Sequence, residues 1–154
     1  MVNVRGPYLI TKACLPLLLK SDLKTTITIS SVGAHVVGPG LSDYQTSKLA
    51  VSRLTEFVAK ENEEAGLVAY SVHPGNMLTD ILNRGEGMDP ALKAVFTEST
   101  ELCADGLVYL SKQRRPWLSG RYVNMTWDLP ELTSSAMEKR IVDGDMLKVR
   151  LVTP

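Results

Sequence analysis

Three polar side chains of this sequence have the types and the spacing of an acid–base site. Tyr44 and Lys48 form a Tyr-x-x-x-Lys pair in the run SDYQTSK, and Ser31 lies thirteen residues before the tyrosine. Residues four apart on a helix share a face, so the Lys48 ammonium can lie near Tyr44 and favour the ionised phenol. Such a phenol can exchange a proton near neutral pH, and a neighbouring hydroxyl can stabilise charge on the reacting oxygen.

The pair alone is weak evidence, because many surface helices carry a tyrosine and a lysine at this spacing. Its neighbourhood strengthens the prediction. The β-branched run 25–31 ends in two serines, and the apolar run 67–73 ends in Pro-Gly. Both patterns predict buried strands that lead into polar loops. In open α/β sheets, ligands bind outside the carboxyl ends of the strands.

Helix and strand patterns alternate along the rest of the chain. We predict helices over 4–20, 43–63, 97–112 and 132–147, strands over 25–31, 67–73 and 120–127, and a loop with short helices over 78–95. The apolar stripe of the second helix is predicted to be Leu49, Val51, Leu54, Phe57 and Val58. This order implies right-handed crossovers and a parallel three-stranded sheet, an α/β fold.

Composition indicates one domain over residues 1–154, with an apolar content of 44% and 17 basic against 17 acidic residues. A balanced charge gives no indication of nucleic acid or of an anionic membrane as a partner. The apolar runs are too short to cross a bilayer, and no signal peptide is visible. The two cysteines have no metal-ligand spacing and are predicted to be buried thiols. We expect a cytoplasmic protein without a metal site.

Four motifs together resemble the short-chain dehydrogenase/reductase family, in its single-domain branch. They lie in the family's order and at its spacings over roughly residues 1–80: Asn3-Val4-Arg5-Gly6, Ile29-Ser30-Ser31-x-Gly33, Tyr44-Gln45-Thr46-Ser47-Lys48 and His73-Pro74-Gly75-Asn76-Met77-Leu78-Thr79. The resemblance implies the C-terminal half of a doubly wound Rossmann-type sheet, with about three strands and flanking helices. The run LSGRYV, followed by Trp127-Asp128, looks like fungal members, many of which act in secondary metabolism.

The resemblance also implies roles for individual residues. Tyr44 would be the acid–base catalyst, Ser31 would bind the substrate carbonyl, and Asn3 would hold a water beside Lys48 in a proton relay. Ser30 is an alternative to Ser31, and Asn3 could equally be an ordinary residue near the chain end. The residues expected to bind the cofactor are Tyr44, Lys48, Pro74, Gly75, Met77 and Thr79.

The same family would supply an NADP cofactor, with NAD possible, a small carbonyl or alcohol substrate, and a homo-oligomer. Family members also carry a Gly-rich strand-turn-helix unit that holds the cofactor pyrophosphate. No G-x-x-x-G-x-G motif follows a strand in this sequence. A second hypothesis is therefore a truncated, catalytically inactive fragment that acts by association through helices 4–20 and 43–63.

Overall fold

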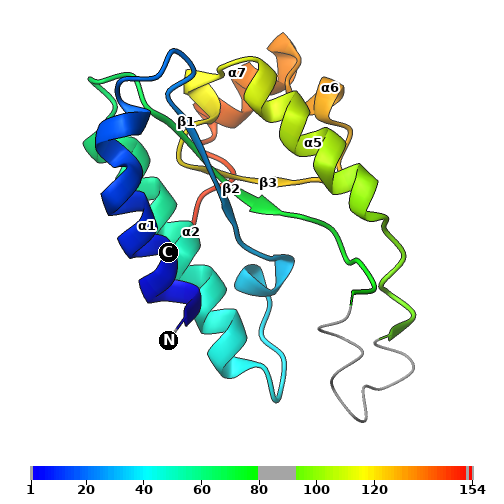
Figure 1. Ribbon diagram of the computed structural model, residues 1–154. Helices are drawn as coiled ribbons and strands as arrows, with labels where there is room; N and C mark the ends of the chain where they lie inside the picture. Colours follow the sequence, from blue (N-terminus) through cyan, green and yellow to red (C-terminus); the bar gives the residue numbers. More distant parts are fainter. Residues whose placement is uncertain (1, 80–92, 152, 154) are drawn as a thin grey trace.

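The protein folds around one parallel sheet with helices on both of its faces (Figure 1). The computed structural model describes residues 2–79, 93–151 and 153. The elements, in chain order, are α1 (Val2–Leu18), β1 (Thr25–Ile29), η1 (Val32–His35), α2 (Ser42–Glu61), β2 (Val68–His73), α5 (Thr100–Lys112), η2 (Pro116–Leu118), β3 (Arg121–Asn124), α6 (Leu129–Leu132) and α7 (Ser135–Asp143). The predicted α/β class and three-stranded parallel sheet are confirmed.

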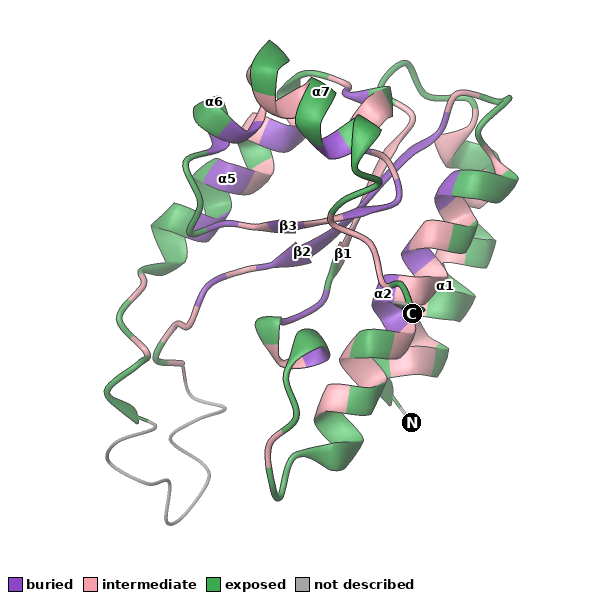
Figure 2. Ribbon diagram, turned by 180° about the vertical axis from the view of Figure 1, so that it is seen from behind, coloured by how far each residue is buried: buried purple, intermediate pink, exposed green. Residues whose placement is uncertain are grey.

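The strand register brings the ends of β1 and β2 to one edge of the sheet. The strand order is β1-β2-β3, and the paired residues run from Thr25 opposite Val68 to Ile29 opposite Val72. On the other side of β2, His73 is opposite Asn124. Every residue of β2 is buried, because this strand has a neighbour on each side and helices on both faces (Figure 2). The loops after β1 and β2 therefore leave from the same edge.

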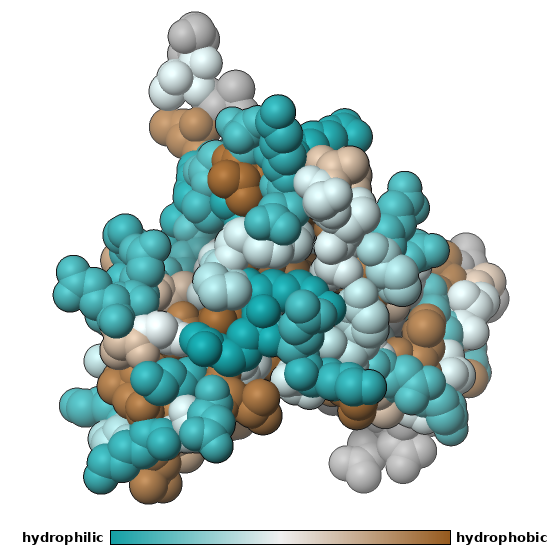
Figure 3. All heavy atoms as spheres, turned by 90° about the horizontal axis from the view of Figure 1, so that it is seen from above, coloured by the Kyte–Doolittle hydropathy of each residue, from teal (hydrophilic) through white to brown (hydrophobic). Residues whose placement is uncertain are grey.

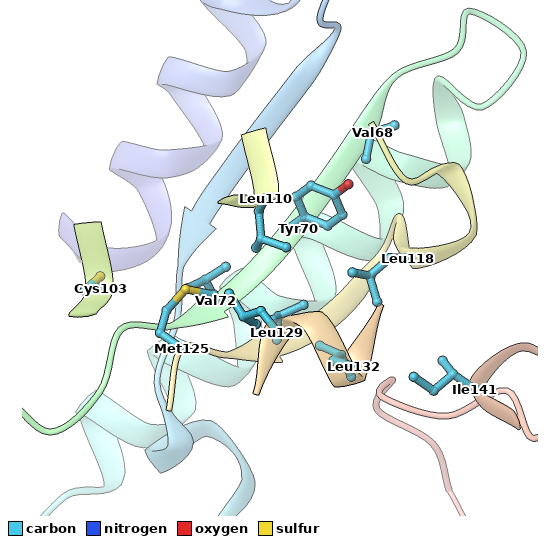
Figure 4. Packing of buried hydrophobic residues seen from close by; sticks show 11 residues of the cluster. Val68, Tyr70, Val72, Cys103, Leu110, Leu118, Met125, Leu129, Leu132 and Ile141 are labelled. Carbon is cyan, nitrogen blue, oxygen red and sulfur yellow. The ribbon is translucent and has the colours of Figure 1, made fainter. Parts of the chain in front are cut away.

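Successive side chains of β2 point to opposite faces of the sheet. One face is apolar, and the other is lined by small or polar side chains. Val68, Tyr70 and Val72 belong to the main apolar core (Figure 4). That core also includes Cys103, Leu110, Leu118, Val123, Met125, Leu129, Leu132 and Ile141. The other side chains of β2, including Ser71, face α2. The apolar face thus forms the hydrophobic core, and the polar face carries the helix with the tyrosine–lysine pair.

Helix α2 packs on the polar face largely through small residues. Of the predicted apolar stripe, Val51 is buried, Leu54 and Val58 are half-buried, and Leu49 and Phe57 are exposed. The buried residues of α2 are Val51, Ser52, Thr55 and Ala59. Phe57, which we expected to be in the stripe, is 55% exposed. A methyl group built on Gly120, which has a φ of +74°, would lie 3.3 Å from the Ala59 Cβ. Small side chains therefore allow the helix and the start of β3 to approach closely.

The C-terminal part differs from the expected single helix over 132–147. It forms two short helices, α6 and α7, because two side chains cap separate helix starts. Asp128 accepts a hydrogen bond from the Glu131 amide, and Ser134 accepts one from the Met137 amide. The predicted loop over 78–95 lies mostly outside the described residues.

Helix α1 makes little contact with the core. None of its residues, all of which the structure describes, is buried, so the expectation of a buried thiol is wrong for Cys14. It holds for Cys103, which is 8% exposed. Within the described residues, no helix is long and apolar enough to cross a membrane.

Two glycines in helices should respond to alanine in opposite directions. A Cβ on Gly106 of α5 would collide with the Met125 sulfur, so we expect Gly106→Ala to destabilise the protein by about 1–3 kcal/mol. A Cβ on Gly6 of α1 would meet nothing within 4 Å. Gly6→Ala should therefore stabilise by about 0.4–1 kcal/mol, since alanine lowers the entropy of the unfolded chain. Urea denaturation measures both, and a neutral Gly106→Ala would contradict this packing.

The buried His73 should make stability depend on pH near neutrality. Burial lowers the pKa of His73, and the nearby Glu98 only partly opposes this. The unfolded chain takes up a proton at about pH 6.5, whereas the folded chain resists protonation until lower pH. The free energy of unfolding should thus be highest above that pH. It should fall as the pH is lowered, by at most about 1.4 kcal/mol per pH unit for this group.

Urea denaturation between about pH 7.5 and about pH 5.5 measures this slope. His73→Asn should flatten it. Burial against Tyr122 also lowers the pKa of His35, so His35→Asn measures the separate share of the chain's other histidine. An unchanged slope in His73→Asn would show that this side chain is protonated equally well in both states.

Candidate active site

The two serines that follow β1 have different environments. Ser30 is 1% exposed, and its hydroxyl donates to the Lys48 carbonyl oxygen at 3.0 Å. Ser31 caps η1, and its Oγ accepts a hydrogen bond from the Gly33 amide at 3.0 Å. Ser30 is therefore fixed between the sheet and α2. The hydroxyl hydrogen of Ser31 is not used in the Gly33 contact and can be donated to another oxygen.

Tyr44 lies beside Ser31, at the carboxyl edge of the sheet. The side chain of Tyr44 is in the first turn of α2 and is 39% exposed. A Cβ built on Gly33 would lie 3.2 Å from the Ser31 Oγ and 3.4 Å from the Tyr44 Cε1. The serine and the phenol ring thus flank the same point, and any side chain larger than a hydrogen at Gly33 would crowd both.

Lys48 lies one turn further along α2 and reaches the end of β1. Its Nζ donates to the Ile29 carbonyl oxygen at 3.0 Å and is 5.7 Å from the centre of the Tyr44 ring. Burial lowers the pKa of Lys48. An ammonium has three donors, so this contact leaves donors for a further acceptor. The structure therefore brings Ser31, Tyr44 and Lys48 together.

A buried chain of three hydroxyls holds α2 in this position. The Ser52 Oγ is 2.7 Å from the Ser30 Oγ and 2.9 Å from the Ser71 Oγ, which links β1, α2 and β2. The Lys48 carbonyl oxygen also lies 3.1 Å from the Ser52 Oγ. Each hydroxyl has one hydrogen, so while Ser30 donates to this carbonyl, Ser52 is the donor in the Ser30–Ser52 contact. Sequence reasoning missed this role of Ser52. Its spacing, four residues after Lys48 and next to the buried Val51, was the available signal.

Asn3 contacts α2 one residue before the lysine. The Asn3 Nδ2 donates to the Ser47 Oγ at 3.3 Å, and Ser47 in turn donates to the Tyr44 carbonyl oxygen at 2.7 Å. Asn3 is thus joined through Ser47 to the backbone of α2. The structure shows no direct Asn3–Lys48 contact among its hydrogen bonds between described residues.

The loop after β2 is held by a residue that the sequence did not indicate. The Asn76 amide donates to the Glu98 Oε2 at 2.9 Å, and the Glu98 amide donates to the Asn76 carbonyl oxygen at 3.2 Å. Met77 also forms a bridge with Glu98. Gly75 has a φ of +105°, and a Cβ there would lie 3.3 Å from the Glu98 Cβ. Pro74 and Thr79 complete the loop, which begins at the same sheet edge as Ser31.

A second tyrosine near this edge is unsuited to proton transfer. The Tyr122 ring contacts the His35 ring edge-on, with 4.5 Å between ring centres. Its hydroxyl is buried without a hydrogen-bond partner among the described residues, and burial raises the pKa of Tyr122 to about 12. Tyr44, by contrast, is partly exposed and has Lys48 beside its ring. The described residues contain no cluster of three or more potential metal ligands.

Comparison with known proteins gives a consistent assignment. The family model of short chain dehydrogenases matches residues 1–88. Short chain dehydrogenase pigC of Monascus ruber is 49% identical over 151 residues, which are 98% of this chain and 49% of that protein. Short chain dehydrogenase tazN of Aspergillus terreus is 48% identical over 140 residues, 89% of this chain and 30% of that protein. The chain thus spans about half the length of pigC, or less for tazN.

Solved structures support the same fold. The NADPH-bound carbonyl reductase from chicken fatty liver has a TM-score of 0.63 and 25% identity, over 80% of this chain and 51% of that one. ElxO with NADP bound has a TM-score of 0.67 at 23% identity, over 80% of this chain and 53% of that one, a likeness of fold alone. The match over residues 1–88 includes the four motifs on which the resemblance rests. This chain belongs to the short-chain dehydrogenase family.

Proposed function

We propose that this chain carries the catalytic side chains of an NAD(P)-dependent oxidoreductase that interconverts a carbonyl and a hydroxyl group. The observation that carries the proposal is the meeting of Ser31 and Tyr44 beside Gly33, with Lys48 behind the phenol. A hydroxyl, a phenol and a cation around one point can bind a carbonyl oxygen and exchange its proton.

In the direction of reduction, the Tyr44 hydroxyl donates its proton to the substrate oxygen as that oxygen becomes a hydroxyl. Ser31 donates a second hydrogen bond to the same oxygen and stabilises the charge that develops on it. Lys48 keeps a positive charge near the phenolate that remains on Tyr44. The buried Ser30–Ser52 contact holds the lysine backbone, so these groups need little rearrangement during the reaction.

The nicotinamide end of the cofactor fits the residues of this edge. Lys48 has donors that its bond to Ile29 leaves unused, and these suit ribose hydroxyls. The positive φ of Gly75 and its lack of a Cβ make room for Glu98, which holds the Pro74–Thr79 loop at this edge. The cofactor supplies the hydride chemistry when it is bound. We propose NADP rather than NAD, since solved structures with this fold contain NADPH or NADP.

We further propose a small organic substrate of fungal secondary metabolism and a homo-oligomer. The relatives named above come from the fungi Monascus ruber and Aspergillus terreus. Helix α1 is exposed along its length and packs on α2. Its exposed apolar residues, such as Ile10 at 66% and Leu17 at 71%, are available to a second copy.

The proposal is tested in a chimera that joins this chain to the part of pigC that it does not span. Tyr44→Phe should lower NADPH-dependent reduction of a small aldehyde by roughly 10²–10⁴-fold, because it removes the proton donor. Cofactor affinity should change little. Tyr8→Phe, the same change at an exposed tyrosine of α1, is the matched control and should retain full turnover. Turnover by Tyr44→Phe close to that of the control would remove Tyr44 from the mechanism.

A further inference from the structure

A hollow of about 410 Å³ lies at the amino ends of the strands, opposite the edge that carries Tyr44. Leu67 and Val68, where β2 begins, and Gly120, which precedes β3, line it together with the last turns of α2. This volume is within the range of small-molecule sites. Ser31, Tyr44 and Lys48 do not line it, so the hollow is separate from the proposed active site.

Positive charge is concentrated in this hollow. The chain has equal numbers of basic and acidic residues, 17 of each. Yet five basic side chains but only two acidic ones line the hollow, namely Arg53, Lys60, Arg114, Lys148 and Arg150 against Glu56 and Glu63. Figure 3 looks onto this end of the molecule and shows hydrophilic side chains gathered over its centre. The excess favours an anionic ligand.

Part of this charge has a structural role. Glu56 is bound by Arg53 at 2.8 Å and by Arg150 at 2.9 Å, and it accepts a hydrogen bond from the Val149 amide. These contacts attach the C-terminal segment to α2. Glu56 is only 14% exposed, and two arginines more than neutralise its charge. Of the other cations, Lys60 pairs with Glu63, and Lys148 pairs with Asp145, which also binds Arg150.

Arg114 is the cation that this network does not use. Its Nη2 donates to the Gly66 carbonyl oxygen, and its Nε is buried without a partner. No ion pair joins Arg114 to a carboxylate within the described part of the chain. Nearby, the Ser119 Oγ accepts from the Ala69 amide at 3.0 Å, which leaves its own hydrogen to donate. The hollow thus offers a guanidinium and a hydroxyl without an anionic partner.

The remaining wall is apolar. Phe57, Leu67 and Pro116 line the hollow beside the cations, and Phe57 is 55% exposed although it is large and aromatic. An arginine beside an aromatic ring suits a planar ligand with a charged group. We propose that this hollow binds a small organic anion, a carboxylate or phosphate attached to a compact aromatic or aliphatic group. This inference is independent of the proposed oxidoreductase activity.

Phenyl phosphate is a suitable probe, with benzyl alcohol as a neutral aromatic control. Isothermal titration of the 154-residue chain at low salt should give saturable binding of phenyl phosphate and none of benzyl alcohol. In amide NMR spectra, phenyl phosphate should shift the resonances of Gly66, Ser119 and Gly120. Shifts centred instead on Gln113 and Thr133, in a neighbouring hollow that Arg114 also lines, would contradict the proposed site.

Arg114→Gln tests the residue that the argument depends on. The change should weaken phenyl phosphate binding by about tenfold or more, because it removes the unpaired guanidinium. Arg140→Gln in α7 changes the net charge equally at an exposed position outside the hollow and should leave the affinity unchanged. Equal weakening by both variants would mean that the anion binds by net charge alone and would overturn the proposal. If Arg114→Gln does not fold, the unchanged chain decides: phenyl phosphate must bind, benzyl alcohol must not, and the shifted amides must be those of Gly66, Ser119 and Gly120.

Discussion

The close contact of α2 with the polar face of the sheet is the constraint on which the site depends. Ser52 reaches both Ser30 and Ser71, and it also bonds to the Lys48 carbonyl oxygen. A buried hydroxyl without a partner would cost about 1–3 kcal/mol, so a shift of the helix that separated these groups would be unfavourable. The hydroxyl chain therefore fixes both the depth and the register of α2 on β1 and β2.

The two faces of the sheet have different tasks as a result. Tyr70 and Val72 pack into the apolar core under α5, which supplies the stabilising buried surface. On the opposite face, Ser71 has a small side chain that hydrogen-bonds to Ser52 of α2. The helix therefore lies close enough to the sheet for Lys48 to reach the Ile29 carbonyl oxygen. A face filled with leucines would hold the helix farther from the sheet. The proposed chemistry depends on the face that contributes less to the core.

Much of the fold could be predicted from local patterns. The β-branched run of β1 and the alternation of helix and strand patterns predicted the α/β class. The spacing of the motifs predicted that Ser31 and Tyr44 lie at one edge of the sheet, as the structure has them. Ser30 and Ser31 could not be distinguished by residue type. The structure separates them because neighbouring residues of an extended segment point to opposite sides. Ser30 bonds to the Lys48 backbone, whereas the Ser31 hydroxyl lies beside the Tyr44 ring.

Other features depend on contacts between segments that are distant in the sequence. The contact face of α2 was predicted from hydrophobicity, and the prediction holds for Val51. It misses Ser52, Thr55 and Ala59, because the close approach of Gly120 to Ala59 favours small residues there. Glu98 carried no motif, and its role arises only where its segment meets Asn76. The terminal helix is divided because Asp128 and Ser134 each cap a separate helix start. In the sequence, the helical pattern runs on past Ser134, so these two local caps were overlooked.

The most direct test of the central claim is a crystal structure of the pigC chimera with NADP and a bound ketone. We expect one ketone oxygen within about 2.6–3.2 Å of both the Ser31 and the Tyr44 hydroxyl oxygens. Lys48 should lie behind the tyrosine, with Ser52 still joining Ser30 to Ser71. A ketone bound away from Tyr44, or a Tyr44 hydroxyl turned away from Ser31, would contradict the account.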